Sequence, residues 1–211
     1  MHLEILVEEF SAKAMLQILL PKMIGSQHSF KVITFQGKQD LLNELPQRLR
    51  GYAHWLPQDY RIVVLIDEDR QDCHPLKQQL EAAALAAGLT TKTNPNLNGT
   101  FQVLNRIAVE ELEAWFWGDF AAMRQAYPRL PTTLPNRRPY RDADAISGGT
   151  AEAMERVLQR ARYHKGGLKK TQAARDIAPH MQPDRNRSKS FQIFYQGIVS
   201  LLTEADKPPA N

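Results

Sequence analysis

The sequence has almost no cysteine and no long apolar run. Cys73 is the single cysteine among 211 residues, which excludes an internal disulfide and a zinc cluster built on thiolates. No uncharged apolar run approaches the ~18–20 residues that cross a bilayer, and the N-terminus lacks the pattern of a signal peptide. The six histidines show no spacing typical of metal ligands. We therefore expect a cytoplasmic protein with no membrane partner.

The chain also lacks two signatures of enzymatic nucleotide and thiol chemistry. Residues 165–169 contain two glycines between lysines, but they lack the Gly-x-x-x-x-Gly-Lys spacing of a phosphate loop and the strand that precedes one. Cys73 and His74 are adjacent, so their side chains diverge at a helix start and do not predict a thiol nucleophile. Any ATP hydrolysis would therefore belong to a partner protein.

Composition and charge indicate a globular protein with an uneven surface. Hydrophobic residues make up 43% of the chain and charged residues 24%, a mixture that can bury a real core. The net charge is +4, but residues 137–189 alone carry +7, which leaves −3 for the rest. A basic C-terminal third predicts a polyanionic partner, and an acidic remainder is compatible with a bound cation. A solvated basic surface is the alternative.

Hydrophobic periodicity predicts an α/β fold. Strand-like runs alternate with helical spacing over the first 117 residues. The run at residues 62–66 has five apolar residues, as in a strand buried on both faces. Alternation of this kind is typical of a mostly parallel sheet flanked by helices. The predicted strands are residues 3–7, 30–35, 62–66 and 101–107, and the predicted helices are 12–24 (with Ser11 as N-cap), 38–52, 74–87 and 109–117.

The chain beyond this pattern divides into an arm and a helical extension. Four prolines fall between Pro128 and Pro139, which excludes a regular helix or central strand there. Helical spacing returns from Thr150, again from Thr171, and in a last helix that begins near Ser188 or Ser190. We predict an α/β domain at 1–127, a Pro-rich linker or arm at 128–147, and a basic helical extension at 148–205 packed on or beside the first domain.

Acidic residues follow three of the four predicted strands. In a parallel sheet, ligands bind outside the carboxyl ends of the strands, so these acids should meet at one edge. Asp67 and Asp69 are two residues apart in an extended path and should point the same way. Glu110 and Glu113 should share one helix face, from which Glu111 is displaced. The acids concerned are Glu8 and Glu9, then Asp67, Glu68 and Asp69, then Glu110, Glu111 and Glu113.

Clustered carboxylates predict a bound cation. Two like charges ~4 Å apart repel by ~1 kcal/mol in water and ~4 kcal/mol at an effective dielectric of 20. Oxygen ligands without nearby cysteine or histidine suit Mg²⁺ or Mn²⁺, which can activate water for phosphodiester hydrolysis. Two simpler explanations stay open. Glu110 and Glu111 suit a helix N-terminus on dipole grounds alone, and Asp67 and Asp69 could simply end a strand.

This arrangement of acids resembles the Toprim fold shared by topoisomerases, primases and OLD-type nucleases. In that family a Glu follows the first strand, an Asp-x-Asp follows the third, and these acids bind Mg²⁺ for phosphodiester chemistry. Leu6-Val7-Glu8-Glu9 would supply the Glu, and Leu65-Ile66-Asp67-Glu68-Asp69 the pair. The sequence departs from the family at Glu9, where many members carry Gly.

Over nearly its whole length the chain resembles a bacterial family known as domain of unknown function 4276. Related Toprim-like proteins are often encoded beside an ATPase and act in defence against phage, which implies a companion ATPase here. The segments that carry the resemblance are Val7-Glu8-Glu9, residues 37–42, 48–52, 64–73 and 106–119 (with Glu110-Glu111-Leu112-Glu113-Ala114-Trp115), Ala126-Tyr127-Pro128, Gly148-Gly149-Thr150 and residues 186–191.

The basic C-terminal part is the candidate nucleic-acid surface. Cations just before the last helix oppose its dipole, so they lose stability unless an anion lies among them. Backbone binding without sequence preference should weaken steeply with salt. Pairing with Asp142, Asp176 and Asp184 is the alternative, and Trp115, Phe116 and Trp117 are expected in the core. The predicted nucleic-acid-binding residues are Lys165, Lys169, Lys170, Arg185, Arg187 and Lys189, and Arg137, Arg138 and Arg141 could join them.

The leading hypothesis is therefore a Mg²⁺-dependent nuclease of Toprim type. Glu8 would act as a ligand or general base, Asp67 and Asp69 as metal ligands, and Glu110 or Glu113 at or beside a second metal. Lys169 or Arg187 would lie near the scissile phosphate. The alternatives are a catalytically inactive scaffold or sensor that binds an ATPase or nucleic acid, and an enzyme acting on a nucleotide or phosphate ester. The choice of DNA or RNA and a homo-oligomeric state stay open.

Overall fold

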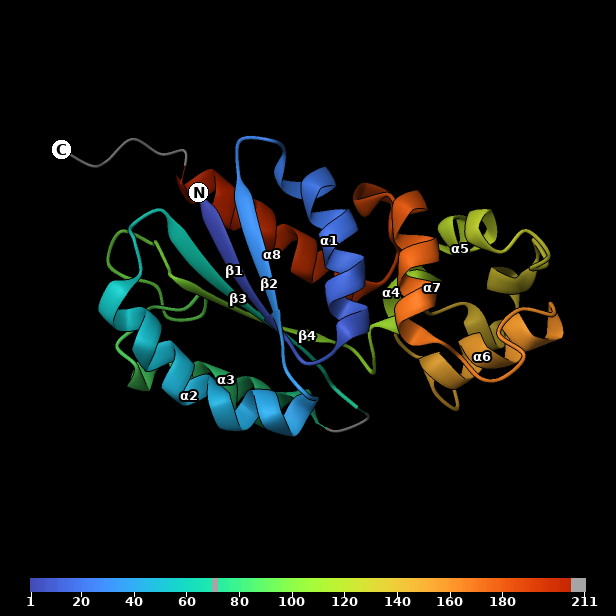
Figure 1. Cartoon of the computed structure of the whole chain (residues 1–211), viewed down its shortest axis with the longest axis horizontal. Coiled ribbons are helices and arrows are strands. Elements are labelled where there is room, and N and C mark those ends of the chain that lie inside the picture. Colours follow the sequence, from blue (N-terminus) through green and yellow to red (C-terminus); the bar gives the residue numbers. More distant parts are fainter. Residues whose placement is uncertain (70–71, 206–211) are drawn as a thin grey trace.

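Four parallel strands form the centre of the protein. The computed structural model describes residues 1–69 and 72–205. Its strands are β1 (His2–Val7), β2 (Ser29–Thr34), β3 (Tyr60–Asp67) and β4 (Val103–Ala108), in the order β2-β1-β3-β4 (Figure 1). Each neighbouring pair is parallel. The predicted α/β fold, with a mostly parallel four-stranded sheet flanked by helices and a C-terminal helical extension, is confirmed.

Helices cover both faces of this sheet, as the alternating apolar side chains require. Side chains of Leu3, Ile5 and Val7 point into the core under α1 (Phe10–Ile24) and α8 (Lys189–Ala205). Leu6 and the even-numbered residues of β3 face α2 (Lys38–Trp55) and α3 (Cys73–Ala86) instead. Residues 62–66 are at most 2% exposed, which confirms a strand buried on both faces.

The remaining helices gather at one end of the molecule (Figure 1). They are α4 (Glu113–Gly118), α5 (Phe120–Ala126), α6 (Thr150–Arg160) and α7 (Lys170–Ile177). The Pro-rich segment holds two short 3-10 turns, Leu134–Asn136 and Arg138–Tyr140, and two more, Ala178–His180 and Pro183–Arg185, precede α8. Helix α7 packs along α1, where Lys22 Nζ donates to three carbonyl oxygens between Ala178 and Met181.

Two helix starts differ from those predicted. The helix expected from residue 109 begins only at Glu113, because Glu110 adopts a φ of 58° and interrupts it. Hydrogen bonds from Glu110 N to Glu68 Oε2 (3.0 Å) and from Asp69 N to Glu110 O (2.8 Å) hold that turn. The prediction that Glu110 and Glu113 share a helix face is therefore wrong. Ser11 is not the N-cap of α1 either, since Glu9 occupies that position and Ser11 Oγ donates to its carboxylate.

The aromatic residues of α4 are core residues, as predicted. Trp115, Phe116 and Trp117 are at most 2% exposed. The ring of Trp115 lies 5.1 Å from that of Phe191 and 5.0 Å from that of Phe194, both in α8. These contacts join the end of the sheet to the last helix. Among the described residues, no helix has both the length and the apolar character that spanning a membrane requires.

Gly118 is required by a close approach of the chain at the end of α4. A Cβ atom there would lie 2.0 Å from Asn186 Oδ1 and 2.6 Å from the backbone nitrogen of Ser188. We expect Gly118→Ala to lower the free energy of unfolding by about 3 kcal/mol, measured by urea denaturation. Gly51→Ala in α2 is the matched control, because no atom lies within 4 Å of its Cβ position. That change should stabilise the protein by roughly 0.5–1 kcal/mol. Equal stabilities of the two variants would contradict this account.

Candidate metal centre

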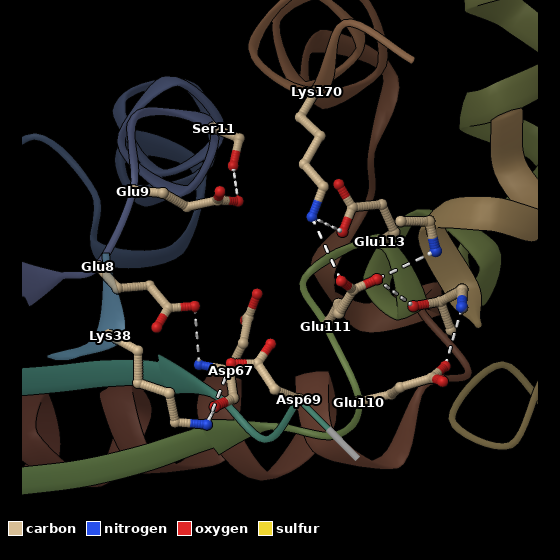
Figure 2. Close-up of polar contacts among 12 residues, drawn as sticks. Glu8, Glu9, Ser11, Lys38, Asp67, Asp69, Glu110, Glu111, Glu113 and Lys170 are labelled. Atoms are coloured by element: carbon tan, nitrogen blue, oxygen red, sulfur yellow. Dashed lines mark hydrogen bonds and ion pairs between the residues drawn. The ribbon is translucent and has the colours of Figure 1, made fainter. Parts of the chain in front are cut away.

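Three carboxylates meet at the carboxyl edge of the sheet. Parallel pairing of Val7 with Leu65 places Glu8, just after β1, beside the end of β3. Asp67 is the last residue of β3, and Asp69 lies two residues beyond it. One ligand oxygen from each of Glu8, Asp67 and Asp69 lies within 4.8 Å of the others (Figure 2). We call these three residues the acidic centre.

Backbone contacts fix the positions of these side chains. The backbone nitrogen of Asp67 donates to Glu8 Oε1 at 3.3 Å. Asp69 has a φ of 55°, so the chain turns sharply after the strand. Lys38 Nζ, at the start of α2, donates to the carbonyl oxygens of Asp67 (2.7 Å) and Glu68 (2.9 Å) and contacts Asp69 Oδ2 at 3.2 Å. Sequence reasoning missed Lys38. No motif indicates that a lysine at the start of one helix will donate hydrogen bonds to the carbonyl oxygens at the end of a different strand.

Burial makes the charges of the acidic centre costly. Glu8 and Asp67 are 7% and 6% exposed. Glu8 Oε2 is buried and has no hydrogen-bond partner among the described residues. Loss of hydration, followed by the charge of Asp69, raises the pKa of Glu8 to about 7. Loss of hydration and the nearby charges of Glu8 and Glu113 raise the pKa of Asp67. An unpartnered oxygen among crowded carboxylates fits a divalent cation.

A buried carboxylate and a lysine lie beside the acidic centre, at the starts of helices α4 and α7. Glu113, at the start of α4, is 1% exposed, and burial raises its pKa to about 7. Lys170, from the start of α7, contacts Glu111 Oε1 and Glu113 Oε2 at 3.5 Å each (Figure 2). Burial alone lowers the pKa of Lys170, but Glu113, Glu9 and Glu111 outweigh it and raise that pKa above its ordinary value. Lys170 therefore carries its charge beside the acidic centre.

Glu110 and Glu111 hold the N-terminus of α6. Glu110 Oε2 accepts a hydrogen bond from Thr150 N at 2.9 Å, and Glu111 Oε2 accepts one from Ala151 N at 3.2 Å. The helix dipole favours anions at this position, although the simpler explanation of these acids placed them at the start of their own helix and not at α6. Figure 2 shows Glu110 directed away from Glu8 and toward α6. A helix face shared with Glu113 therefore no longer supports Glu110 as a metal ligand, and its place at a second metal stays a prediction.

The carboxylate of Asp144 caps the start of α8, just after the cations at Arg185 and Arg187. The carboxylate of Asp144 accepts hydrogen bonds from Lys189 N, from Ser188 Oγ (2.6 Å) and from Ser190 Oγ (3.0 Å). Asp144 therefore supplies an anion at this helix start from within the protein, so the position of the cations does not by itself indicate an external phosphate. Arg187 and Lys189 still line a groove of about 290 Å³ with Arg141, and their role in nucleic-acid binding stays a prediction, as does that of Arg185.

The remaining predicted basic residues separate into two groups. Lys170 pairs with Glu111 and Glu113 beside the acidic centre, whereas Lys165 and Lys169 lie on an exposed loop before α7. Tyr127 Oη holds that loop through His164 Nε2 (2.8 Å) and Asp176 Oδ2 (2.9 Å). Asp176 thus accepts a hydrogen bond from Tyr127. The alternative explanation had paired Asp176 with one of the basic residues at the surface.

Asp72, Cys73 and His74, at the start of α3, also bring potential metal-ligand atoms together. Asp72 and His74 are exposed and two residues apart in the sequence, and His74 Nδ1 lies 2.8 Å from Asp72 Oδ1. Asp72 also accepts from His74 N as the N-cap of α3. This local cap accounts for the cluster. Arg70 and Gln71, within the predicted motif at residues 64–73, lie outside the described residues.

Comparisons with known proteins agree with this fold. The model of a family described as domain of unknown function (DUF4276) matches residues 7–199. The solved C-terminal region of the Burkholderia pseudomallei OLD protein is 17% identical with a TM-score of 0.50, and the match covers 95% of this chain and 98% of that one. The C-terminal region of the Xanthomonas campestris pv. campestris OLD protein is 16% identical with a TM-score of 0.48 and 96% coverage of both. No curated protein sequence matches significantly.

Proposed function

Given that the chain belongs to the DUF4276 family, whose model matches residues 7–199, we propose that it is a divalent-metal-dependent nuclease. One observation carries the proposal: Glu8, Asp67 and Asp69 converge from two parallel strands, and a buried oxygen of Glu8 has no partner among the described residues. Carboxylates in this state need a cation or protons to offset their repulsion.

The three residues of the acidic centre would hold Mg²⁺ or Mn²⁺, whose hard character matches an all-oxygen donor set. Such an ion, when bound, lowers the pKa of a coordinated water and stabilises charge on a phosphodiester. Asp69 is the exposed member and lies on the solvent side, whereas Glu8 and Asp67 form the buried floor. Lys38 keeps Asp67 and Asp69 in place through the backbone between them. Glu113 lies close enough to raise the pKa of Asp67, so it would contribute negative charge next to the ion.

Lys170 is the group that we assign to the substrate. Its ammonium group lies at the junction of Glu111, Glu113 and the acidic centre, and its raised pKa keeps it charged at neutral pH. A fixed cation beside bound metal ligands can stabilise the charge that develops on a phosphate as it is attacked. The sequence placed Lys170 only within a general basic surface, and its closeness to the acids follows from the packing of α7 on α1.

Metal affinity should depend on pH because a proton and a cation compete for Glu8. With a pKa of about 7, Glu8 is mostly protonated at pH 6 and mostly ionised at pH 8. We expect Mn²⁺ to bind about tenfold more tightly at pH 8 than at pH 6, with a proton released on binding at the lower pH. Titration calorimetry in two buffers of different ionisation enthalpy measures both quantities. Glu8→Gln should remove the proton release, and a wild-type affinity independent of pH over this range would contradict the assignment.

The function itself is tested with purified protein and defined polynucleotides. Plasmid DNA, tRNA and total RNA are incubated with Mg²⁺, with Mn²⁺ or with EDTA, in the presence and absence of an ATPase encoded nearby. Cutting that requires the metal supports the nuclease. Binding without cutting under every condition would favour the inactive scaffold or sensor, and release of phosphate only from nucleotides or simple esters would favour the third alternative. A companion ATPase and a role in defence against phage are part of the proposal, because the resemblance to Toprim-like proteins encoded beside an ATPase implies them.

A further inference from the structure

A second candidate site lies away from the acidic centre, between the Pro-rich segment and helix α6. It is a pocket of about 140 Å³. Leu134 and Val157, both buried, give it an apolar floor, and Arg129, Arg137 and Arg160 line its sides. We call it the arginine pocket. None of its residues takes part in the contacts of the acidic centre.

The arginine pocket has an excess of positive charge. Among the described residues, no carboxylate lies within ion-pair distance of any of the three arginines. Arg129 is nevertheless fixed: its guanidinium lies 4.1 Å over the ring of Tyr163 and donates to the carbonyl oxygen of Arg162 at 3.2 Å. Arg160 lies in the last turn of α6, where the helix dipole alone favours a cation. Arg129 is held by Tyr163 and Arg162 but has no negative partner in the described part of the chain, and Arg137 lies at no helix C-terminus of this kind.

Three cations around one small cavity repel one another, and an anion removes that repulsion. We propose that the arginine pocket binds the terminal phosphate of a nucleic-acid strand. A dry cavity of ~150 Å³ holds a benzene ring, so 140 Å³ admits a phosphate group but not a whole nucleotide. A terminal phosphate carries nearly two negative charges at neutral pH, whereas an internal phosphodiester carries one. Arginine is also the side chain whose planar fork matches phosphate oxygens.

Helix α6 connects the pocket to the acidic centre. Thr150 and Ala151 at its start contact Glu110 and Glu111, and Val157 and Arg160 near its end line the pocket. Eleven residues of helix separate these ends by roughly 15 Å. At 3.4 Å per nucleotide of one B-form strand, this span corresponds to about four nucleotides. The pocket would thus hold a strand end a few nucleotides from the cut, an extension that rests on the proposed nuclease function.

Binding is measured first without cleavage, so that its outcome is independent of nuclease activity. Fluorescence anisotropy in EDTA compares one oligonucleotide bearing a 5′-phosphate, a 3′-phosphate or only hydroxyl ends. We expect one phosphorylated end to bind about tenfold more tightly than the hydroxyl form, as one or two charge-assisted hydrogen bonds provide. Combining Arg137→Gln with Arg160→Gln should reduce that preference to less than about twofold.

The matched control combines Arg50→Gln in α2 with Arg175→Gln in α7, which removes the same charge from exposed positions outside the pocket. This control should keep the preference, and thermal melting checks that all variants fold. Equal affinity of the wild-type protein for all three oligonucleotides would overturn the proposal. So would a pocket variant that weakens all three equally, because that result indicates diffuse charge. Mononucleotide or inorganic phosphate binding as tightly as the oligonucleotide would contradict the assignment to a strand end.

Discussion

Asp67→Asn is expected to lower metal-dependent cleavage by at least about a thousandfold without destabilising the fold. Loss of a buried metal ligand removes several kcal/mol of transition-state stabilisation, and each 1.36 kcal/mol corresponds to a factor of ten. The same substitution removes one of the charges that crowd Glu8 and Glu113. The new amide can also donate to Glu8 Oε2, which has no partner among the described residues. Cleavage assays and thermal melting at pH 8 measure the two effects.

Stability should therefore move in the direction opposite to activity. A carboxyl whose pKa is raised in the folded state contributes stability below its unfolded pKa, and this stability is lost as the pH rises through the folded pKa. For Glu8 that window extends from about 4.5 to about 7. At pH 8 without metal, Asp67→Asn should melt at or above the wild-type temperature, and Mn²⁺ should raise only the wild-type value. Asp59→Asn, an exposed change before the other end of β3, should alter neither property. Full activity of Asp67→Asn would place the chemistry elsewhere.

Lys170→Gln should have the second largest effect on cleavage, with a different signature. We expect cleavage to fall about a hundredfold or more, because one preorganised charge at the reacting phosphate is lost. Metal affinity should stay the same or increase, because a positive charge that repels Mn²⁺ beside the acidic centre has been removed. Cleavage kinetics and calorimetry of the same variant separate these two results. Substitution of a metal ligand would instead lower cleavage and metal affinity together.

Lys169→Gln provides the control at the neighbouring position. Lys169 is exposed on the loop before α7, so its loss should weaken nucleic-acid binding only a few-fold and mainly at low salt. Lys170→Arg tests whether charge alone suffices, and partial recovery of cleavage is expected. If Lys170→Gln cleaves as fast as wild type, the lysine only offsets the buried charge of Glu113 and does not act on the substrate.

The meeting of acidic side chains at one edge of the sheet was predictable, because it follows from parallel strands that each end in acidic residues. Parallel strands bring their carboxyl ends to one edge, so Glu8 after β1 and Asp67 after β3 had to be neighbours. The core positions of Trp115 and Trp117 were predictable for a similar reason, since large aromatic side chains gain most from burial. Each of these predictions needed only the pattern of apolar residues and the sequence of elements.

Predictions that depended on local geometry or distant packing were less successful. Glu110 shows the spacing of a helix face, but the side chain of Glu68, 42 residues away, holds it in a turn before the helix. The carboxylate of Asp144 accepts a hydrogen bond from the start of α8, 45 residues along the chain. Lys38 contacts Asp67, and Lys170 contacts Glu113, from helices whose orientation relative to the sheet cannot be predicted from the sequence. Such contacts arise from tertiary packing, which hydrophobic periodicity does not encode.

Anomalous scattering from crystals soaked in Mn²⁺ tests the central claim most directly. We predict a peak with carboxylate oxygens of Glu8, Asp67 and Asp69 at about 2.1 Å, the distance typical of small hard divalent cations. The peak should be absent from crystals of the Asp67→Asn variant and present in those of Asp59→Asn. Density only at Asp72, Cys73 and His74, or Glu8 directed away from Asp67 in the soaked crystal, would contradict the account.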